Sequence, residues 1–161
     1  MTDVKALVLD VDGVLTDGGV WWGPDGQEWK RFSFIDIMGV SLAIKAGLIV
    51  GLISGEDSPL VDRFAAKMGI ADVEKGCRDK ARALRAFAER RGLSLFEVAF
   101  MGDDVNDLEA MTVVGVSATT ANAVQVVRET ATFVSERQGG HGAVREFVDA
   151  ILRVRTAARA R

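Results

Sequence analysis

The sequence contains only one cysteine, Cys77, in 161 residues. A lone cysteine cannot form a disulfide within the chain, and it has no partner at the spacing of a zinc motif, so we expect Cys77 to be structural. A chain of this length is about one domain and can bury a core without disulfides or a structural metal. We therefore predict a single domain over residues 1–161.

Long apolar runs and a strong net charge are also absent. Glycine and charged residues interrupt the apolar stretches well before the ~20 residues that a membrane helix needs, and no basic segment precedes an apolar one as in a secretory signal. A net charge of −3 gives no basic surface for nucleic acid. We therefore expect a cytoplasmic protein that binds neither membranes nor nucleic acid.

Short apolar runs alternate with segments of helical periodicity. Strands are predicted over residues 6–11, 48–53 and 98–101, with weaker ones over 114–117 and 132–135. Helices are predicted over 36–46, 58–68, 78–91, 106–114, 121–129 and 144–160. This alternation is typical of an α/β fold, a doubly wound parallel sheet with helices on both faces. Gly47, Gly69 and Gly92 stand where left-handed residues commonly end helices.

Residues 19–34 depart from this alternation. They contain all three tryptophans, Trp21, Trp22 and Trp29, around the turn sequence Pro24-Asp25-Gly26. Proline fixes φ and glycine supplies a positive φ, so we predict a β-hairpin that projects from the sheet. The rings either pack on their own domain or form a subunit interface. A hairpin this small cannot bury three indoles alone, which favours the interface.

Two aspartates, Asp10 and Asp12, stand two residues apart where the first predicted strand ends. In a strand, side chains at this spacing point the same way, so both carboxylates could face one ligand. Two like charges held so close need a cation or a shared proton.

Three more polar groups follow strand ends or begin a helix: Ser54-Gly55, Asp79-Lys80 and Gly102-Asp103-Asp104-Val105-Asn106-Asp107. Ligands bind at that edge of open α/β sheets. Each group alone is common in turns and helix caps. Together, in this order, they indicate chemistry on a phosphate.

The combination suits phosphoryl transfer. A carboxylate such as Asp10 can attack phosphorus and form an aspartyl-phosphate. Mg²⁺, held by hard oxygen ligands that include Asp103, would offset the charge repulsion. Asp12 can exchange protons with the leaving group and with water, and Ser54 and Lys80 can bind the phosphate oxygens.

These four motifs resemble those of the haloacid dehalogenase superfamily of phosphotransferases. The resemblance implies that Asp10 is the nucleophile, Asp12 the general acid/base, and Ser54 and Lys80 the phosphate binders. It implies Mg²⁺ ligands from Asp10, the Asp12 backbone carbonyl and Asp103. The residues that it places around these ligands are Asp104, Asn106 and Asp107.

Motif spacing leaves room for the hairpin but for no large cap domain. Over nearly its full length the chain resembles the capless 3-deoxy-octulosonate 8-phosphate phosphatase family, which forms homotetramers. The matching segments are 10–18, Asp36 with Gly39, 79–80, 102–104 and the C-terminal run Gly139-Gly140-His141-Gly142-Ala143-Val144-Arg145-Glu146. In that family the glycine-rich run lies near the active site of an adjacent subunit.

That placement implies a substrate or interface contact for Arg145. The alternative is an ordinary helix residue paired with Glu146 or Asp149. We expect His141, at a variable position of the run, to be an exposed loop residue. The resemblance also implies substrate contacts for Asp36 and Gly55.

Two positions depart from the octulosonate pattern. The family has Thr-Gly-Arg where this chain has Ser54-Gly55-Glu56, and an arginine where it has Ile35. A related branch that acts on nine-carbon sugar acid 9-phosphates resembles this chain in having the glutamate with a lysine on the next helix, here Lys67. Glu56 and Lys67 either contact substrate or are two surface charges. We predict a Mg²⁺-dependent phosphatase of a phosphorylated 2-keto-3-deoxy sugar acid, with nine carbons favoured over eight.

Two functions of other classes fit parts of the pattern. A phospho-accepting receiver domain also uses an acidic cluster, a hydroxyl and a lysine on a doubly wound sheet. Its acidic pair and its phospho-accepting aspartate lie on different strands, whereas Asp12 follows Asp10 by two residues. A catalytically inactive scaffold is disfavoured by the complete acidic set.

Overall fold

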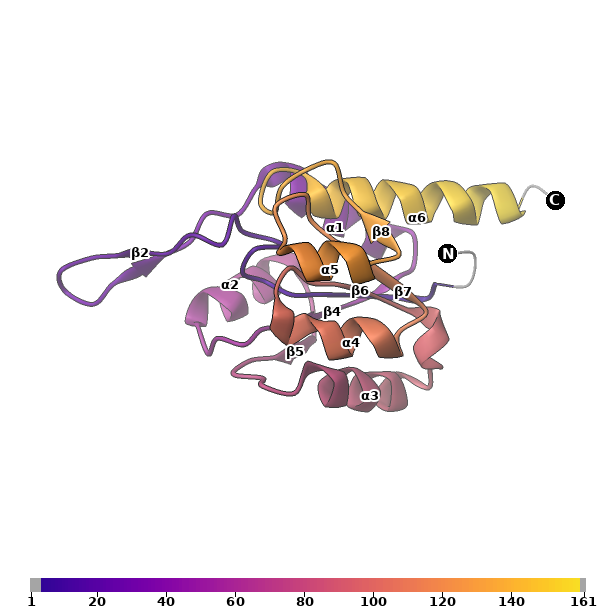
Figure 1. Cartoon of the computed structure of the whole chain (residues 1–161), viewed down its shortest axis with the longest axis horizontal. Helices are drawn as coiled ribbons and strands as arrows, with labels where there is room; N and C mark the ends of the chain where they lie inside the picture. Colours follow the sequence, from indigo (N-terminus) through magenta and orange to yellow (C-terminus); the bar gives the residue numbers. More distant parts are fainter. Residues whose placement is uncertain (1–3, 160–161) are drawn as a thin grey trace.

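The computed structural model describes residues 4–159 and contains a six-stranded parallel sheet (Figure 1). The spatial order of the strands is β5-β4-β1-β6-β7-β8. Their bounds are β1 Ala6–Leu9, β4 Ile49–Ile53, β5 Asp72–Glu74, β6 Val98–Met101, β7 Val116–Thr119 and β8 Phe133–Val134. β1 is central and pairs in parallel with β4 and β6. The doubly wound α/β fold predicted from the sequence is confirmed.

Helices cover both faces of this sheet. Their bounds are α1 Phe34–Lys45, α2 Pro59–Met68, α3 Lys80–Arg91, α4 Leu108–Val113, α5 Gln125–Thr130 and α6 Ala143–Arg159. Successive side chains of β1 alternate between two buried clusters. Leu7 and Leu9 pack with residues of α1, α2 and α6, whereas Ala6 and Val8 pack with residues of α3, α4 and α5. Within residues 4–159, no helix is both long and apolar enough to cross a bilayer.

The predicted elements are found, with several changes in their bounds. Gly47, Gly69 and Gly92 have φ values of 81°, 68° and 63°, which confirms their left-handed conformation. β1 ends at Leu9 because the chain turns at the aspartates. The predicted helix 106–114 is a 3₁₀ turn, Val105–Asp107, followed by α4, and the predicted helix 121–129 is the shorter α5. The predicted end of the last helix, residue 160, lies outside the described residues.

Two elements were missing from the sequence-based prediction. The edge strand β5 has the sequence Asp-Val-Glu, so it offers neither an apolar run nor an alternating pattern. The second is a 3₁₀ turn, Leu95–Glu97, which begins with a capping box from Ser94.

The predicted hairpin is present as β2 Trp21–Trp22 paired antiparallel with β3 Glu28–Trp29. Figure 1 shows it projecting away from the sheet and its helices. Trp21 and Trp22 are 72% and 75% exposed, so the described residues leave most of these two rings uncovered; Trp29 is 50% exposed and borders a cleft with Phe32 and Phe64. That another subunit covers them stays a prediction.

Candidate active site

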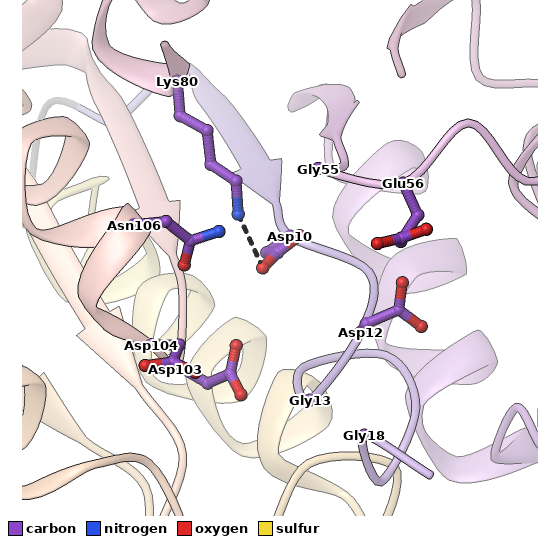
Figure 2. A pocket seen from close by; sticks show the side chains of 10 residues that line it. All are labelled: Asp10, Asp12, Gly13, Gly18, Gly55, Glu56, Lys80, Asp103, Asp104 and Asn106. Atoms are coloured by element: carbon purple, nitrogen blue, oxygen red, sulfur yellow. Dashed lines mark hydrogen bonds and ion pairs between the residues drawn. The ribbon is translucent and has the colours of Figure 1, made fainter. Parts of the chain in front are cut away.

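The predicted motifs meet where the central strands end. Asp10 follows β1, and its N–H donates to the carbonyl of Met101 at the end of β6 (2.9 Å). Because β4 and β6 flank β1 in parallel register, Ser54 and Asp103 come to lie on either side of Asp10. Asp10 and Asp103 border an open cleft of about 250 Å³, and Gly55, the residue after Ser54, also lines it, whereas Ser54 itself does not. The residues that line it are Asp10, Asp12, Gly13, Gly18, Gly55, Glu56, Lys80, Asp103, Asp104 and Asn106 (Figure 2).

Lys80 is buried at the first position of α3, which Asp79 caps by accepting the N–H of Arg82. Its Nζ lies 2.8 Å from Oδ2 of Asp10 and 2.6 Å from Oδ1 of Asp107. Burial opposes the charge of Lys80, but the two carboxylates outweigh it and raise the pKa of Lys80. The ammonium is therefore fixed beside the predicted nucleophile.

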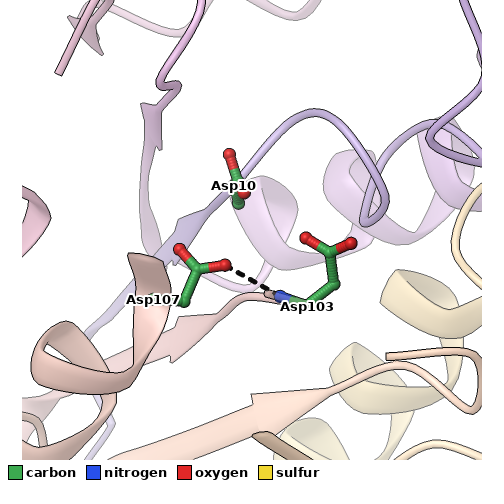
Figure 3. Close-up of side chains that lie close together, drawn as sticks. All are labelled: Asp10, Asp103 and Asp107. Carbon is green, nitrogen blue, oxygen red and sulfur yellow. Dashed lines mark hydrogen bonds between the residues drawn. The ribbon is translucent and has the colours of Figure 1, made fainter. Parts of the chain in front are cut away.

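Three carboxylates, those of Asp10, Asp103 and Asp107, form an acidic cluster in which one oxygen of each lies within 4.8 Å of the others (Figure 3). Burial raises the pKa of Asp10 despite the nearby ammonium of Lys80. Burial, together with the charges of Asp10 and Asp107, raises the pKa of Asp103 to about 8. One ammonium does not balance three carboxylates, so the cluster favours an added cation.

The donor set of this cluster fits a hard divalent cation such as Mg²⁺, which prefers oxygen ligands. Space for an ion is kept open by Gly13, which has a φ of 82°. A side-chain Cβ at this position would collide with the carboxylate of Asp103. Glycine thus serves here both for its backbone conformation and for the room beside Asp103.

Asp107 also fixes the motif that carries Asp103. Its Oδ2 accepts the N–H groups of Asp103 (2.9 Å) and Asp104 (3.2 Å), and Gly102 leaves room for its side chain. The sequence prediction placed Asp107 around the ligands, and the structure brings its carboxylate into the cluster itself. The spacing Asp103-x-x-x-Asp107 was the signal for this. Asp104 and Asn106 have exposed side chains at the rim.

Asp12 lies apart from the acidic cluster. In Figure 2 it stands on the Glu56 side of Asp10, and Asp103 and Asp104 stand on the other side. Both of its carboxylate oxygens lie 2.9 Å from Nζ of Lys30, a residue that the sequence analysis did not single out. Nothing in the sequence pattern links the two, because the pairing depends on where the hairpin returns to the sheet.

Ser54 is buried, and its hydroxyl oxygen accepts the N–H of Glu56 (3.1 Å). Its own N–H donates to the carbonyl of Glu74 in β5 (2.8 Å). This turn presents Gly55 and Glu56 to the cleft.

Three predicted substrate contacts lie outside the cleft. Asp36 is buried and accepts the N–H groups of Gly142 (3.0 Å) and Arg145 (3.1 Å), so it joins α1 to the start of α6. The guanidinium of Arg145 pairs with Asp149, one of the two partners foreseen. Lys67 lines a second cleft, of about 290 Å³, and its Nζ lies 6.0 Å from the ring centroid of Phe34. Their roles toward substrate stay predictions.

The glycine-rich run before α6 packs on the loop that follows Asp12. Gly140 donates its N–H to the carbonyl of Val14 (3.0 Å), and a Cβ at Gly139 would collide with the carbonyl of Gly13. His141 is exposed, as predicted, with Nε2 2.8 Å from a guanidinium nitrogen of Arg31. In the described chain this run thus braces the loop that carries Asp12.

Comparison with known proteins agrees with this geometry. Residues 53–147 match the model of the haloacid dehalogenase-like hydrolase family. The chain is 35% identical over 150 residues to the 3-deoxy-D-manno-octulosonate 8-phosphate phosphatase of Salmonella typhi, covering 93% of this chain and 80% of that protein.

Solved structures are similar over nearly the whole chain. The phosphatase of the same name from Moraxella catarrhalis, in complex with a magnesium ion, a phosphate ion and a KDO molecule, superposes with a TM-score of 0.94 at 33% identity, covering 99% and 91% of the two chains. The cobalt-bound deoxy-D-mannose-octulosonate 8-phosphate phosphatase of Haemophilus influenzae gives a TM-score of 0.93 at 34% identity, covering 96% and 91%.

Proposed function

Because this chain belongs to the haloacid dehalogenase-like hydrolase family and is a phosphomonoester hydrolase, we propose that its cleft dephosphorylates a 2-keto-3-deoxy sugar acid with the help of Mg²⁺. The observation that carries the proposal is the position of Asp10. Its carboxylate lies between the ammonium of Lys80 and the carboxylate of Asp103, at the end of the central strand.

In this proposal Asp10 attacks phosphorus and forms an aspartyl-phosphate, which water then hydrolyses. Lys80 holds the Asp10 carboxylate in place and offers charge to the phosphate oxygens, and Ser54 and the turn after it complete the phosphate site. Asp12 gives a proton to the leaving alkoxide and later takes one from water.

The metal belongs to the acidic side of the cleft. Asp10 and Asp103 would hold Mg²⁺ together with the backbone carbonyl of Asp12, and Asp107 offers a further carboxylate within reach. The ion would neutralise charge on the phosphoryl group when bound. Asp104 and Asn106 lie at the rim beside these ligands.

For the organic part of the substrate, the similar proteins are named for an eight-carbon sugar acid phosphate. Our preference for a nine-carbon one rests on Glu56, an exposed carboxylate at the cleft where the octulosonate pattern has arginine. A carboxylate there would accept hydrogen bonds from the hydroxyls of a longer chain. Lys67 lines the second cleft, so it can help to select the substrate only if the substrate extends beyond the first cleft.

We also propose a homotetramer in the cytoplasm. The exposed tryptophans of the hairpin support assembly, as do exposed apolar residues of α1 such as Phe34, Ile35 and Met38. In such an assembly, Asp36 and Arg145 could contact substrate that is bound in a neighbouring subunit.

Substrate choice is tested by kcat/KM on eight- and nine-carbon keto-deoxy sugar acid phosphates, measured side by side. We expect wild type to prefer the nine-carbon substrate and Glu56→Arg to lose about two- to tenfold of that preference, the worth of one net hydrogen bond. Glu109→Arg, the same charge reversal at an exposed site on α4, is the control. Equal rates on both substrates, unchanged by Glu56→Arg, would remove Glu56 as the selecting residue.

A further inference from the structure

Lys30, the residue that follows strand β3 of the hairpin, points back toward Asp12 rather than outward. Its side chain is 5% exposed, whereas that of Asp12 is 28% exposed. Nζ of Lys30 lies 2.9 Å from each carboxylate oxygen of Asp12. The carboxylate is therefore held at two points by one buried cation.

The hairpin and α2 together fix Lys30. Glu28 lies 3.6 Å from its Nζ and accepts hydrogen bonds from the indole of Trp22 (3.2 Å) and the hydroxyl of Ser58 (3.2 Å). Ser58 is also the N-cap of α2. A continuous chain of polar contacts thus runs from an exposed tryptophan to the carboxylate at the cleft.

The pair of Lys30 and Asp12 differs from an ordinary surface ion pair, because the lysine is buried. Exposed pairs contribute little, because water screens them and both side chains lose rotamer freedom. Here the aliphatic stem of Lys30 lines the second cleft beside Trp29 and Phe32, so the ammonium is pre-placed before it meets Asp12. Its remaining freedom is small, and so is that of the carboxylate it holds.

We infer that Lys30 is a positioning residue that holds the Asp12 carboxylate for the second half of the reaction; this rests on the function proposed above. In that half, the oxygen of water bonds to phosphorus as the bond from phosphorus to the Asp10 oxygen breaks. The proton that water loses goes to the Asp12 carboxylate. A base that can rotate away from the cleft takes this proton less often.

The test uses p-nitrophenyl phosphate, whose nitrophenolate leaves without a proton, so only the second half depends on Asp12. Lys30→Met keeps most of the buried stem and removes the charge. We expect a rapid burst of about one nitrophenolate per active site, followed by a steady rate about 10²-fold below wild type, the cost of misplacing a catalytic group. Lys30→Arg, which can also bind both oxygens, should restore most of the rate.

A double-mutant cycle with Asp12→Asn separates positioning of Asp12 from other roles. If Lys30 acts through Asp12, the double variant is no slower than Asp12→Asn alone. Lys45→Met removes an exposed charge elsewhere and should match wild type. Should Lys30→Met fail to fold, Lys30→Gln keeps an uncharged N–H donor group and should give the same burst with a milder loss.

Several results would overturn the inference. One is that Lys30→Met shows no burst and keeps the wild-type steady rate. Another is that the burst and the steady phase of this variant are slowed by the same factor. A third is that the rate losses of Lys30→Met and Asp12→Asn multiply in the double variant. Wild-type protein that releases neither nitrophenolate nor phosphate would instead overturn the proposed function, and this inference with it.

Discussion

The acidic cluster of Asp10, Asp103 and Asp107 and the hairpin of residues 19–34 are built in opposite ways. The side chains of Asp10, Asp107 and Lys80 are buried, and Lys80 forms an ion pair with each of the two aspartates. The hairpin has strands of two residues, and its tryptophans face outward. One region is completed by its own chain, and the other offers surface that the described residues do not cover.

This contrast separates the residues proposed for the reaction, which are buried, from the hairpin, which is exposed. The groups that we propose act on phosphorus are fixed by strand ends and by a helix terminus, so their positions are set before any ligand arrives. The hairpin touches this machinery at one carboxylate, through Lys30 and Asp12.

Replacing the nucleophile should have the largest effect. Asp10→Asn removes the attacking oxygen, so we expect phosphate release to fall by at least about 10⁴-fold, as when other enzymes lose their nucleophile. Folding should persist, because a neutral amide relieves repulsion from Asp103 and Asp107. Activity, circular dichroism and Tm check this, with Asp25→Asn in the hairpin turn as the control. Turnover within tenfold of wild type would remove Asp10 as the nucleophile.

Removing the metal should stop turnover as well and expose a pH dependence. The pKa values of Asp10 and Asp103 lie above their usual value of 3.8 in the folded protein. The folded state therefore binds protons more tightly than the unfolded state, and the free energy of unfolding falls as pH rises from about 4 to about 8. The raised pKa of Lys80 acts above this window. Without metal, Tm should be higher at pH 5 than at pH 8.

Adding Mg²⁺ should reverse that trend, because the ion replaces the bound protons. At 100 times its Kd it would add about 2.7 kcal/mol to the free energy of unfolding. The rise in Tm should be larger at pH 8 than at pH 5, and Asp103→Asn should abolish it. A Tm that depends on neither pH nor Mg²⁺ would mean that the cluster is not the metal site.

Charging the hairpin should have the smallest effect on the chemistry and a clear one on assembly. Trp21→Glu places a charge in the exposed aromatic surface, so light scattering should show a shift toward monomer. Turnover of p-nitrophenyl phosphate should stay within a few-fold, since the acidic cluster belongs to one chain. Phe96→Glu is the matched control, because Phe96 is 81% exposed but lies far from the hairpin in sequence, after α3. An unchanged mass would count against the interface.

Much of the site could be predicted because parallel strands bring their carboxyl ends to one edge. Apolar runs marked β1, β4 and β6, so Asp10, Ser54 and Asp103 were expected to converge, and they do. The hairpin was predicted from a turn sequence between aromatic residues, and it is present. These predictions succeeded because each strand end and the hairpin turn could be recognised from residues close together in the sequence.

Contacts between distant segments could not be predicted in this way. Lys30 meets Asp12 because of the direction in which the hairpin returns, which no periodicity encodes. Asp36 was expected to contact substrate, but in this chain it binds N–H groups of residues 142 and 145, more than a hundred positions later. The resemblance to the family singled out the aspartate at position 36 but did not predict which groups it binds. The separation of Glu56 and Lys67 into two clefts likewise depends on tertiary packing.

The packing of Gly139 and Gly140 on the loop after Asp12 also sets an order in time. During synthesis Asp10 leaves the ribosome early, but the segment that braces the loop after it leaves late. At about 5–20 residues per second, roughly 6–25 s separate Gly13 from Gly140. A nascent chain therefore carries Asp10 and Asp12 before the segment that packs on their loop, and we expect phosphatase activity to begin only when the start of α6 has emerged and docked.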